Sequence, residues 1–372
     1  MRFDGISFIL TIVIALFGVL AIYSATYTVL VPISLLCKKQ LFGLITGIII
    51  YLVFANLNYH RLCYMGYWTY FLVILLLIFT ILLGSIGMGA QRWINLGIIK
   101  FQPSELTKLF LPAYITFYLK SENNHPAYSF GSFIPLLIAL AVSTILILKQ
   151  PDLGTAMLVL STGLIVFWLA GLTNKFFMWS LLVVLISGPI VWNGLHEYQK
   201  KRITVFLGFG DNSREGYQIM QSKIAIGSGG FLGKGFRQGT QNKLKFLPES
   251  QTDFIFSVIC EELGYLGALI LLALYLALYW RIFLFMQNVP NFFSKLLAAG
   301  LAAHVIISTI VNMGMVIGLL PTVGIPLPLV SYGVSNLWIT MASLGWLNGI
   351  LTQAANEPKT PVFRKTKSIE LN

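Results

Sequence analysis

Long apolar segments recur along nearly the whole of this 372-residue chain, and their spacing constrains the fold more than any other feature. Hydrophobic residues make up 57% of the sequence and charged residues only 10%. A segment of about 17 to 25 apolar residues crosses the hydrocarbon core of a bilayer, where the backbone must satisfy its own hydrogen bonds as a helix. The sequence therefore predicts an all-α polytopic membrane protein. We expect about ten transmembrane helices, over residues 6–24, 38–56, 66–84, 103–119, 131–150, 154–171, 175–195, 253–282, 296–319 and 328–352.

These helices divide the chain into four regions. Helices one to seven fall in residues 1–195 and helices eight to ten in residues 253–353, separated by a large loop at 196–252 and followed by a tail at 354–372. With a cytoplasmic N-terminus, the short cytoplasmic loops and the tail carry ten Lys and Arg, against five on the other side. Because Lys and Arg concentrate in cytoplasmic loops, both termini are expected in the cytoplasm and the large loop outside it.

The large loop holds much of the net charge of +12. It contains nine Lys and Arg and four Asp and Glu, in a chain with no resemblance to a soluble basic domain, so we expect no nucleic-acid partner. A basic loop beside a bilayer suits either a lipid pyrophosphate or the headgroups of acidic lipids, and composition does not separate the two.

The chain shows no recognisable cofactor motif. The three cysteines and four histidines are scattered without metal-ligand spacing. The glycine-rich run at 227–239 is not a nucleotide-binding P-loop, because Ser228 replaces the first required glycine and Gly235 stands where Ser or Thr should follow the lysine. Its glycines fit either a backbone that approaches a phosphate or a flexible loop.

Ionisable residues inside expected membrane spans are costly, so they usually pair or face a polar cavity. Glu105 and Lys108 follow Pro103 at the start of the fourth span and lie on one helix face, three residues apart. Lys149 and Asp152 flank the junction of the fifth and sixth spans. These four charges are expected to converge on one outward-facing cavity, with structural ion pairs as the alternative.

Asp253 lies where the polar loop re-enters the membrane as a helix. A carboxylate there is a candidate catalytic base, and it is also favoured simply as a cap of the helix N-terminus. Glu261 and Glu262 lie about 12–14 Å further along that helix and are expected to pair inside the bundle. The proline- and glycine-rich segment at 320–333 predicts an irregular re-entry that adds a second wall on the same side.

Five segments together resemble the SEDS family of peptidoglycan glycosyltransferases, and its elongation type (RodA) more than its division type (FtsW). They appear in the expected order and are QPSELTKL (102–109), KQPDLGTA (149–156), GYQIMQSKIAIGSGGFLGKGFRQGTQ (216–241), LPESQTDFIFSVICEELG (247–264) and LPTVGIPLPLVSYG (320–333). Two details depart from the family pattern: Gln251 stands in place of a histidine, and Val334 and Asn336 alter the SYGGSS element.

The resemblance implies a multi-pass protein of the bacterial inner membrane that polymerises lipid II into β-1,4 glycan strands during cell elongation. Its implied partners are a class B penicillin-binding protein and other membrane proteins of the elongation complex. The family's essential loop aspartate corresponds to Asp253, its intramembrane pair to Glu105 and Lys108, and its QPD acid to Asp152. The leaving pyrophosphate needs positive charge. Candidate groups are a divalent cation (Mg or Mn), Lys108, and the loop residues Lys234, Arg237, Lys243 and Lys245.

Two rival functions fit parts of the sequence. A flippase for lipid-linked precursors would also use broken helices and intramembrane charges. Against it, no internal repeat is visible and the charged elements gather on one side of the membrane. A scaffold that only recruits the transpeptidase would leave the intramembrane charges without a purpose.

Overall fold

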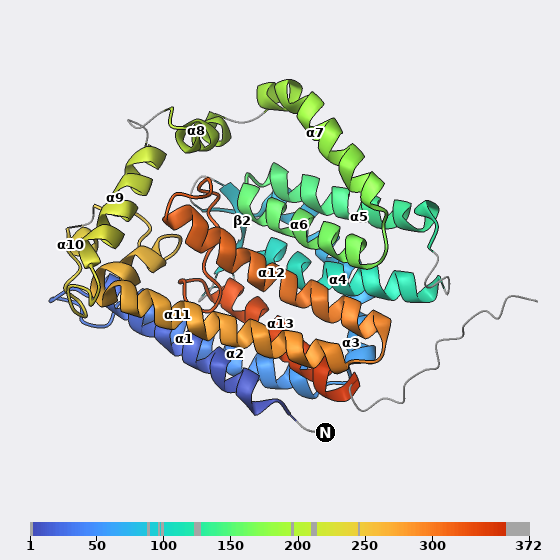
Figure 1. The fold of residues 1–372 in the computed structure, drawn as a ribbon, viewed down its shortest axis with the longest axis horizontal. Helices are drawn as coiled ribbons and strands as arrows, with labels where there is room; N and C mark the ends of the chain where they lie inside the picture. The colour runs from blue at the N-terminus through green and yellow to red at the C-terminus, as the bar shows by residue number, and fades with distance from the viewer. Residues whose placement is uncertain are drawn as a thin grey trace, which may run out of the picture.

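The computed structural model describes residues 3–87, 90–95, 97, 100–122, 128–194, 197–209, 214–244 and 246–354. The protein is predominantly helical (Figure 1). Its helices are α1 (Gly5–Thr26), α2 (Leu35–Asn56), α3 (Tyr59–Leu83), α4 (Pro103–Ser121), α5 (Phe130–Lys149), α6 (Leu153–Leu169), α7 (Asn174–Gly194), α8 (Glu197–Phe206), α9 (Arg214–Gly229), α10 (Thr240–Lys243), α11 (Ile255–Asn288), α12 (Phe292–Val316) and α13 (Val334–Ala354).

Among the described residues, six helices are long and apolar enough to cross a membrane, namely α1, α2, α3, α5, α11 and α12. The apolar helix α6 is shorter, with 17 residues. Helix α13 lies inside the bundle and buries polar side chains such as Ser343 and Asn348. A helix surrounded by other helices can carry polar groups that a lipid-facing helix cannot, which explains its lower hydropathy. The chain is therefore a multi-pass membrane protein.

Several helices begin at side chains suited to the N-cap position. The Ser34 hydroxyl accepts a hydrogen bond from the Cys37 backbone N–H, and the Asn58 side chain accepts from two N–H groups of α3. Asp152 caps α6 through the Thr155 N–H, and Pro103 occupies the first turn of α4. Such caps satisfy backbone donors that have no partner within the helix, so these helix starts are encoded locally.

The bundle is packed closely around α13. Trp346 of α13 is fully buried, and Gly345 lies against the backbone of α2. A Cβ at Gly345 would lie 2.3 Å from the Tyr51 carbonyl oxygen, so only glycine permits this approach of the two helices. Small residues at helix contacts are typical of membrane bundles, where close backbone packing replaces the hydrophobic effect as the source of stability.

A small antiparallel sheet between α3 and α4 was not predicted. It consists of β1 (Ser85–Gly87), β2 (Ala90–Asn95) and β3 (Lys100–Phe101), in the order β1-β2-β3. Strand β2 pairs with β3 through Ile94 opposite Phe101. The all-α prediction was wrong here, because strands this short give no clear alternation of apolar and polar residues. The sheet places the Arg92 guanidinium 3.6 Å from Asp152, the N-cap residue of α6.

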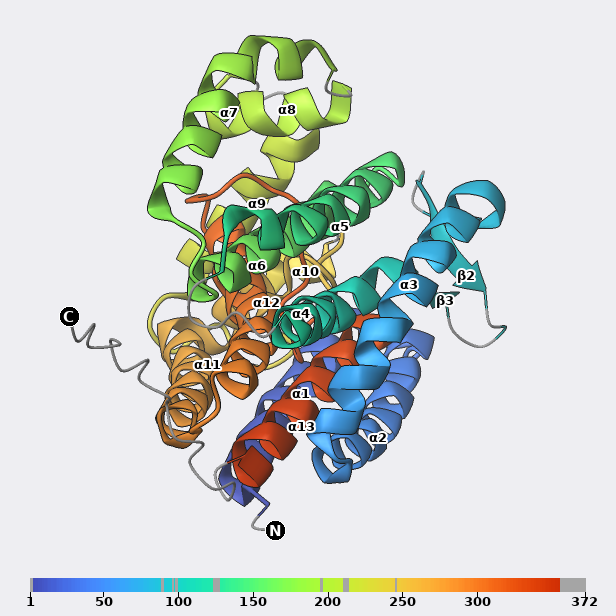
Figure 2. The same ribbon diagram turned by 90° about the vertical axis from the view of Figure 1, so that its right-hand side faces the viewer.

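The region at 196–252, expected as a loop, contains the helices α8, α9 and α10. Helices α8 and α9 follow α7, which stands apart from the main bundle (Figure 2). Helix α9 packs back against α11 and α12, and the Ser222 hydroxyl donates a hydrogen bond to the Val316 carbonyl. The predicted loop therefore contains three helices that were not predicted, because polar helices outside the long apolar segments give no hydropathy signal.

Two element boundaries also differ from expectation. Helix α11 is kinked at Gly264, whose φ of 66° interrupts the helical backbone, so residues 255–263 form a separate first segment. The last helix begins at Val334 rather than at residue 328, because the preceding proline-rich segment has no regular structure. That segment, residues 317–333, is the irregular re-entry expected from its prolines and glycines, and it is here called the re-entry segment.

Candidate functional site

Asp253 lies in the turn immediately before α11 and is anchored through its backbone. Its carbonyl accepts a hydrogen bond of 3.0 Å from the side-chain amide of Asn312, which also donates to the Ile325 carbonyl at 2.8 Å. The neighbouring Thr252 carbonyl accepts from the Ser331 hydroxyl at 2.6 Å. The turn is thus fixed both to α12 and to the re-entry segment.

Asp253 does not cap α11. The N-cap residue is Phe254, and no side-chain hydrogen bond caps this helix. The capping explanation for an acid at this position therefore has no support in the geometry. The Asp253 side chain is half-buried, and other charged groups act on its carboxyl.

Four charged side chains influence the Asp253 carboxyl. Burial and the nearby Glu249 carboxylate raise its pKa to about 6, while Arg202 and Arg92 act in the opposite direction and Asp152 adds a further small increase. Burial disfavours the charged carboxylate, and a like charge beside it has the same effect. A carboxyl with a pKa near 6 accepts a proton more readily than an ordinary aspartate and is still mostly ionised at pH 7.

Gly324 of the re-entry segment lies beside both Asp253 and Arg202. A Cβ at this position would lie 3.5 Å from Asp253 Oδ2 and 3.9 Å from the nearest guanidinium nitrogen of Arg202. The acid and the guanidinium therefore both border the same glycine. Its φ of 73° lies in the left-handed region, and this backbone conformation is what favours glycine here.

Asp152 joins the starts of α4 and α6 to the small sheet. One carboxylate oxygen accepts a hydrogen bond of 2.6 Å from the Gln102 side chain and lies 3.6 Å from the Arg92 guanidinium, and the other accepts from the Thr155 N–H. The two junctions therefore meet, through Gln102 and Arg92. Of the charges expected to converge there, Asp152 takes part in this contact, whereas Glu105 and Lys108 pair with each other.

Glu105 and Lys108 form an ion pair with each other. Lys108 Nζ lies 2.5 Å from Glu105 Oε2, and each side chain is only 6% exposed. Lys108 also lies near His304 of α12, whose Nε2 contacts the Ser343 hydroxyl at 3.3 Å. Neither member of the pair is among the groups that act on Asp253. The geometry is that of a buried pair between α4, α12 and α13.

The loop cations predicted to contact pyrophosphate lie elsewhere. Lys234 Nζ pairs with Glu261 at 2.6 Å, and the Arg237 guanidinium lies 3.3 Å from the centre of the Tyr27 ring. Lys243 is exposed on α10, and Lys245 lies outside the described residues. None of the described three acts on the Asp253 carboxyl.

The glycine-rich run at 227–239 is packed onto the first segment of α11. The N–H groups of Lys234 and Gly235 donate to the carbonyls of Glu261 and Glu262, each at 3.0 Å. A Cβ at Gly233 would lie 2.1 Å from the Glu262 carbonyl oxygen. These amides are already bonded, so close helix packing explains the glycines better than a phosphate cradle or a flexible loop does.

Arg92 and Arg202 are the site residues that sequence reasoning missed. Arg202 is one of nine basic residues in the predicted loop, and composition does not separate it from Lys200 and Lys201, which precede it on α8. Arg92 depends on a small sheet with no clear signal of its own. Among the described residues, no group of three or more His, Cys, Asp or Glu side chains is arranged to hold a metal ion.

Comparisons with known proteins agree with this architecture. The family model for cell cycle proteins of the FtsW/RodA/SpoVE type matches residues 5–356. The peptidoglycan glycosyltransferase MrdB of Escherichia coli K12 is 40% identical over 319 residues, covering 85% of each chain. MrdB of Helicobacter pylori J99 is 35% identical over 356 residues, covering 94% of this chain and 90% of its own.

Solved structures share the fold. One chain of a peptidoglycan synthase complex that coordinates polymerization and crosslinking superposes with a TM-score of 0.80 at 29% identity. The match covers 96% of the present chain and 100% of the solved one. The rod shape determining protein RodA of Thermus thermophilus has a TM-score of 0.72 at 26% identity, covering 96% of this chain and 99% of its own. The chain belongs to the FtsW/RodA/SpoVE family, also called the SEDS family.

Proposed function

We propose that this protein is a peptidoglycan glycosyltransferase of cell elongation, which polymerises lipid II into β-1,4 glycan strands at the outer face of the inner membrane. The observation that carries the proposal is the environment of Asp253, whose carboxyl has a pKa of about 6 and lies near the cations Arg202 and Arg92. The names of its E. coli and H. pylori relatives support the same activity.

The proposed reaction is a single displacement with inversion. The 4-hydroxyl of the acceptor sugar attacks the anomeric carbon of the donor, and the bond from that carbon to the lipid pyrophosphate breaks. Asp253 takes the proton of the attacking hydroxyl, so the acceptor oxygen gains nucleophilic character as the new bond forms. The pyrophosphate leaves with its negative charge, and the proton remains on the carboxyl.

Arg92 and Arg202 are assigned to the leaving group. Guanidinium groups bind phosphate oxygens in a bidentate manner, and fixed positive charge stabilises a leaving pyrophosphate as it develops. These two arginines take the role that the sequence suggested for Lys234, Arg237 and Lys243. A Mg²⁺ or Mn²⁺ ion, where required, would be held mostly by the substrate's own pyrophosphate, as Mg²⁺ commonly is in phosphate chemistry.

The proposed topology keeps ten spans with both termini in the cytoplasm. The six candidate spans are then joined by α4, α6, α7 and α13. Helix α6 is short and α13 buries its polar side chains inside the bundle, whereas α7 is an apolar helix of 21 residues outside it. This arrangement puts Asp253 and the region 196–252 on the outer side. The partner is a class B penicillin-binding protein, in line with the solved synthase complex that couples polymerization and crosslinking, together with other membrane proteins of the elongation complex.

The test is polymerisation of lipid II by the purified protein with its transpeptidase partner in detergent. We expect glycan chains on a gel, insensitive to a β-lactam that blocks crosslinking. The Asp253→Asn variant should lose about 10²–10⁴-fold in rate. Glu197→Gln is the matched control, because Glu197 is an acid of the same region whose side chain is 81% exposed. Normal activity of Asp253→Asn would show that Asp253 is not the catalytic base.

The same assay separates the flippase alternative. Detergent-solubilised protein has no two sides, so translocation cannot register in it, whereas polymerisation can. If lipid II moves across vesicles containing the protein but no polymer forms with any partner, the polymerase proposal is wrong.

A further inference from the structure

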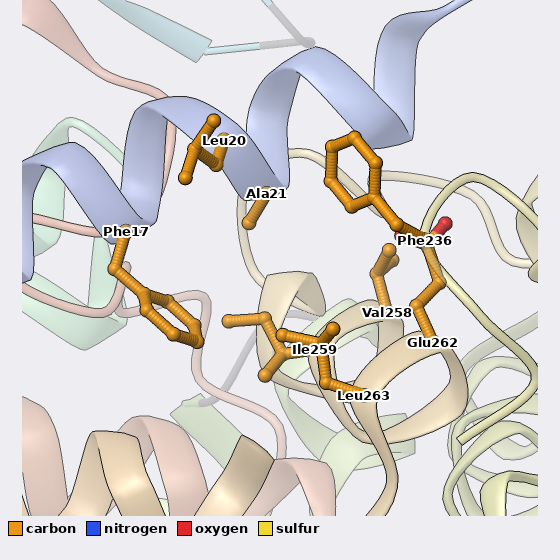
Figure 3. A pocket seen from close by; sticks show the side chains of 8 residues that line it. All are labelled: Phe17, Leu20, Ala21, Phe236, Val258, Ile259, Glu262 and Leu263. Atoms are coloured by element: carbon orange, nitrogen blue, oxygen red, sulfur yellow. The ribbon is translucent and has the colours of Figure 1, made fainter. Parts of the chain in front are cut away.

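An apolar pocket of about 230 Å³ lies between α1, α11 and the glycine-rich run (Figure 3). Phe17, Leu20 and Ala21 face it from α1, Phe236 from the run, and Val258 and Ile259 from α11. None of these residues belongs to the charged group around Asp253. The pocket is therefore separate from the site proposed for glycan transfer.

The pocket opens toward the surface that faces lipid. Its floor is buried, with Val258 and Ile259 at 1% and 2% exposure, whereas Leu20 and Phe236 at its rim are 57% and 45% exposed. Leu20 also ends a row of exposed apolar side chains along the candidate span α1, spaced three or four residues apart. These are Ile9, Val13, Leu16 and Leu20. A hydrocarbon chain would reach the pocket directly from the bilayer.

Glu262 is the one acid in the pocket lining, and it is already bonded. Its carboxylate accepts hydrogen bonds from the Ser24 hydroxyl at 2.5 and 2.7 Å and from the Arg237 N–H at 3.1 Å. These bonds tie the end of α1, the run and α11 together at the head of the pocket. The surface left for an occupant is therefore apolar.

Arg237 places a positive charge at the head of the pocket. It follows Phe236 directly, and its guanidinium lies over the Tyr27 ring, 3.3 Å from the ring centre. Its Nε is buried without a hydrogen-bond partner. Among the described residues no carboxylate lies within ion-pair distance of this guanidinium, unlike Lys234 in the same run. An apolar pocket with a cation at its outer end matches a lipid that carries an anionic phosphate.

We propose that this pocket and Arg237 form a binding site for an anionic phospholipid, with one acyl chain between α1 and α11 and the phosphate at the guanidinium. The inference is independent of the proposed function, since it uses neither Asp253 nor its neighbours. A lipid bound there bridges α1, the glycine-rich run and α11. It therefore stabilises the packing of the run on the first segment of α11.

The test is native mass spectrometry of the full-length protein in detergent, titrated with phosphatidylglycerol or phosphatidylcholine. We expect one phosphatidylglycerol bound at least tenfold more tightly than phosphatidylcholine, the size expected for one charge-assisted contact. Arg237→Gln should abolish this preference, and Arg237→Lys should keep most of it. Ala21→Phe, which fills the pocket, should weaken the binding of both lipids.

Matched controls are Lys38→Gln and Leu16→Phe. Lys38 is an exposed cation at the start of α2, next to the end of α1, and Leu16 is an exposed side chain on the lipid-facing row. Both controls should bind phosphatidylglycerol as the wild type does. The proposal would be overturned if Lys38→Gln lost the preference for phosphatidylglycerol as fully as Arg237→Gln, or if Arg237→Gln kept that preference unchanged. So would displacement of phosphatidylglycerol by a polyprenyl phosphate at much lower concentration, because the site would then belong to the substrate carrier.

Discussion

The pH dependence of polymerisation gives the sharpest test of the assignment of Asp253. With a carboxyl pKa of about 6, the base is about nine-tenths ionised at pH 7 and about one-tenth ionised at pH 5. An aspartate at the ordinary value of 3.8 would remain ionised throughout this range. We therefore expect the rate to fall close to tenfold per pH unit below pH 6, because only the ionised form accepts the proton.

Substitution of the charged neighbours should shift the pKa of Asp253 in opposite directions. Glu249 raises the pKa of the Asp253 carboxyl, so Glu249→Gln should move the acid limb of the profile to lower pH. Arg202 lowers it, so Arg202→Gln should move the limb to higher pH. The assay is the initial rate of polymerisation of fluorescent lipid II between pH 4.5 and 8, with thermal unfolding measured at each pH to exclude loss of fold.

Stability supplies an independent check. The folded protein binds the Asp253 proton more tightly than the unfolded chain does, so protonation of this carboxyl stabilises the fold. This contribution to the free energy of unfolding is fully present below pH 3.8 and is lost as the pH rises through about 6. Keeping the carboxyl ionised at pH 7 then costs about 3 kcal/mol. Asp253→Asn should accordingly unfold at higher temperature than the wild type at pH 7 while being inactive. An acid limb centred below pH 4.5 would refute the reasoning, as would the same limb in Asp253→Asn.

Three further predictions concern the surrounding residues. Glu105→Ala and Lys108→Ala should each lower the free energy of unfolding by about 3–5 kcal/mol, because each leaves a buried charge unpaired. The double variant Glu105→Lys, Lys108→Glu should recover most of this stability, as measured by thermal unfolding. Gly324→Ala should lower the free energy of unfolding by about 1–2 kcal/mol, because alanine is strained in the left-handed backbone of this position. Its polymerisation rate should stay near that of the wild type, since the added Cβ would only touch Asp253 at 3.5 Å, and a large loss of rate would contradict this expectation. Arg92→Gln should reduce polymerisation without shifting thermal unfolding by more than about 1 kcal/mol, since its pair with Asp152 is partly exposed, and a large loss of stability would indicate a structural role instead.

Much of the fold could be predicted from the sequence because its strongest signals are local. The long apolar segments of α1, α3 and α5 are recognisable from composition, and the capping side chains mark several helix starts. The start of α13 was misplaced, because the prolines and glycines before it predict irregular backbone but do not show at which residue it ends. That segment is held by distant partners, including the Tyr275 hydroxyl, which donates to the Pro328 carbonyl.

The acids of the site were predicted from the sequence, whereas the cations beside them were not, because their positions also depend on distant parts of the chain. Asp253 and Asp152 are unusual acids in an apolar sequence, so composition alone distinguishes them. The cations beside Asp253 could not be chosen from a basic region by composition. Arg202 comes from α8 and Arg92 from β2, and their meeting depends on contacts between elements far apart in the sequence. Lys234 is equally suitable by composition, but it pairs with Glu261 and is not among the groups that act on Asp253.

The anchoring of Asp253 has a consequence for how such a site can diverge. The acid is fixed by Asn312 of α12 and by the re-entry segment, whereas Arg202 is carried by α8, outside the main bundle (Figure 2). Substitutions in α7 and α8 therefore alter the spacing between base and cation while the packed bundle keeps its shape. Related proteins can retain one proton acceptor and adjust separately to leaving groups, partners or membranes of different thickness.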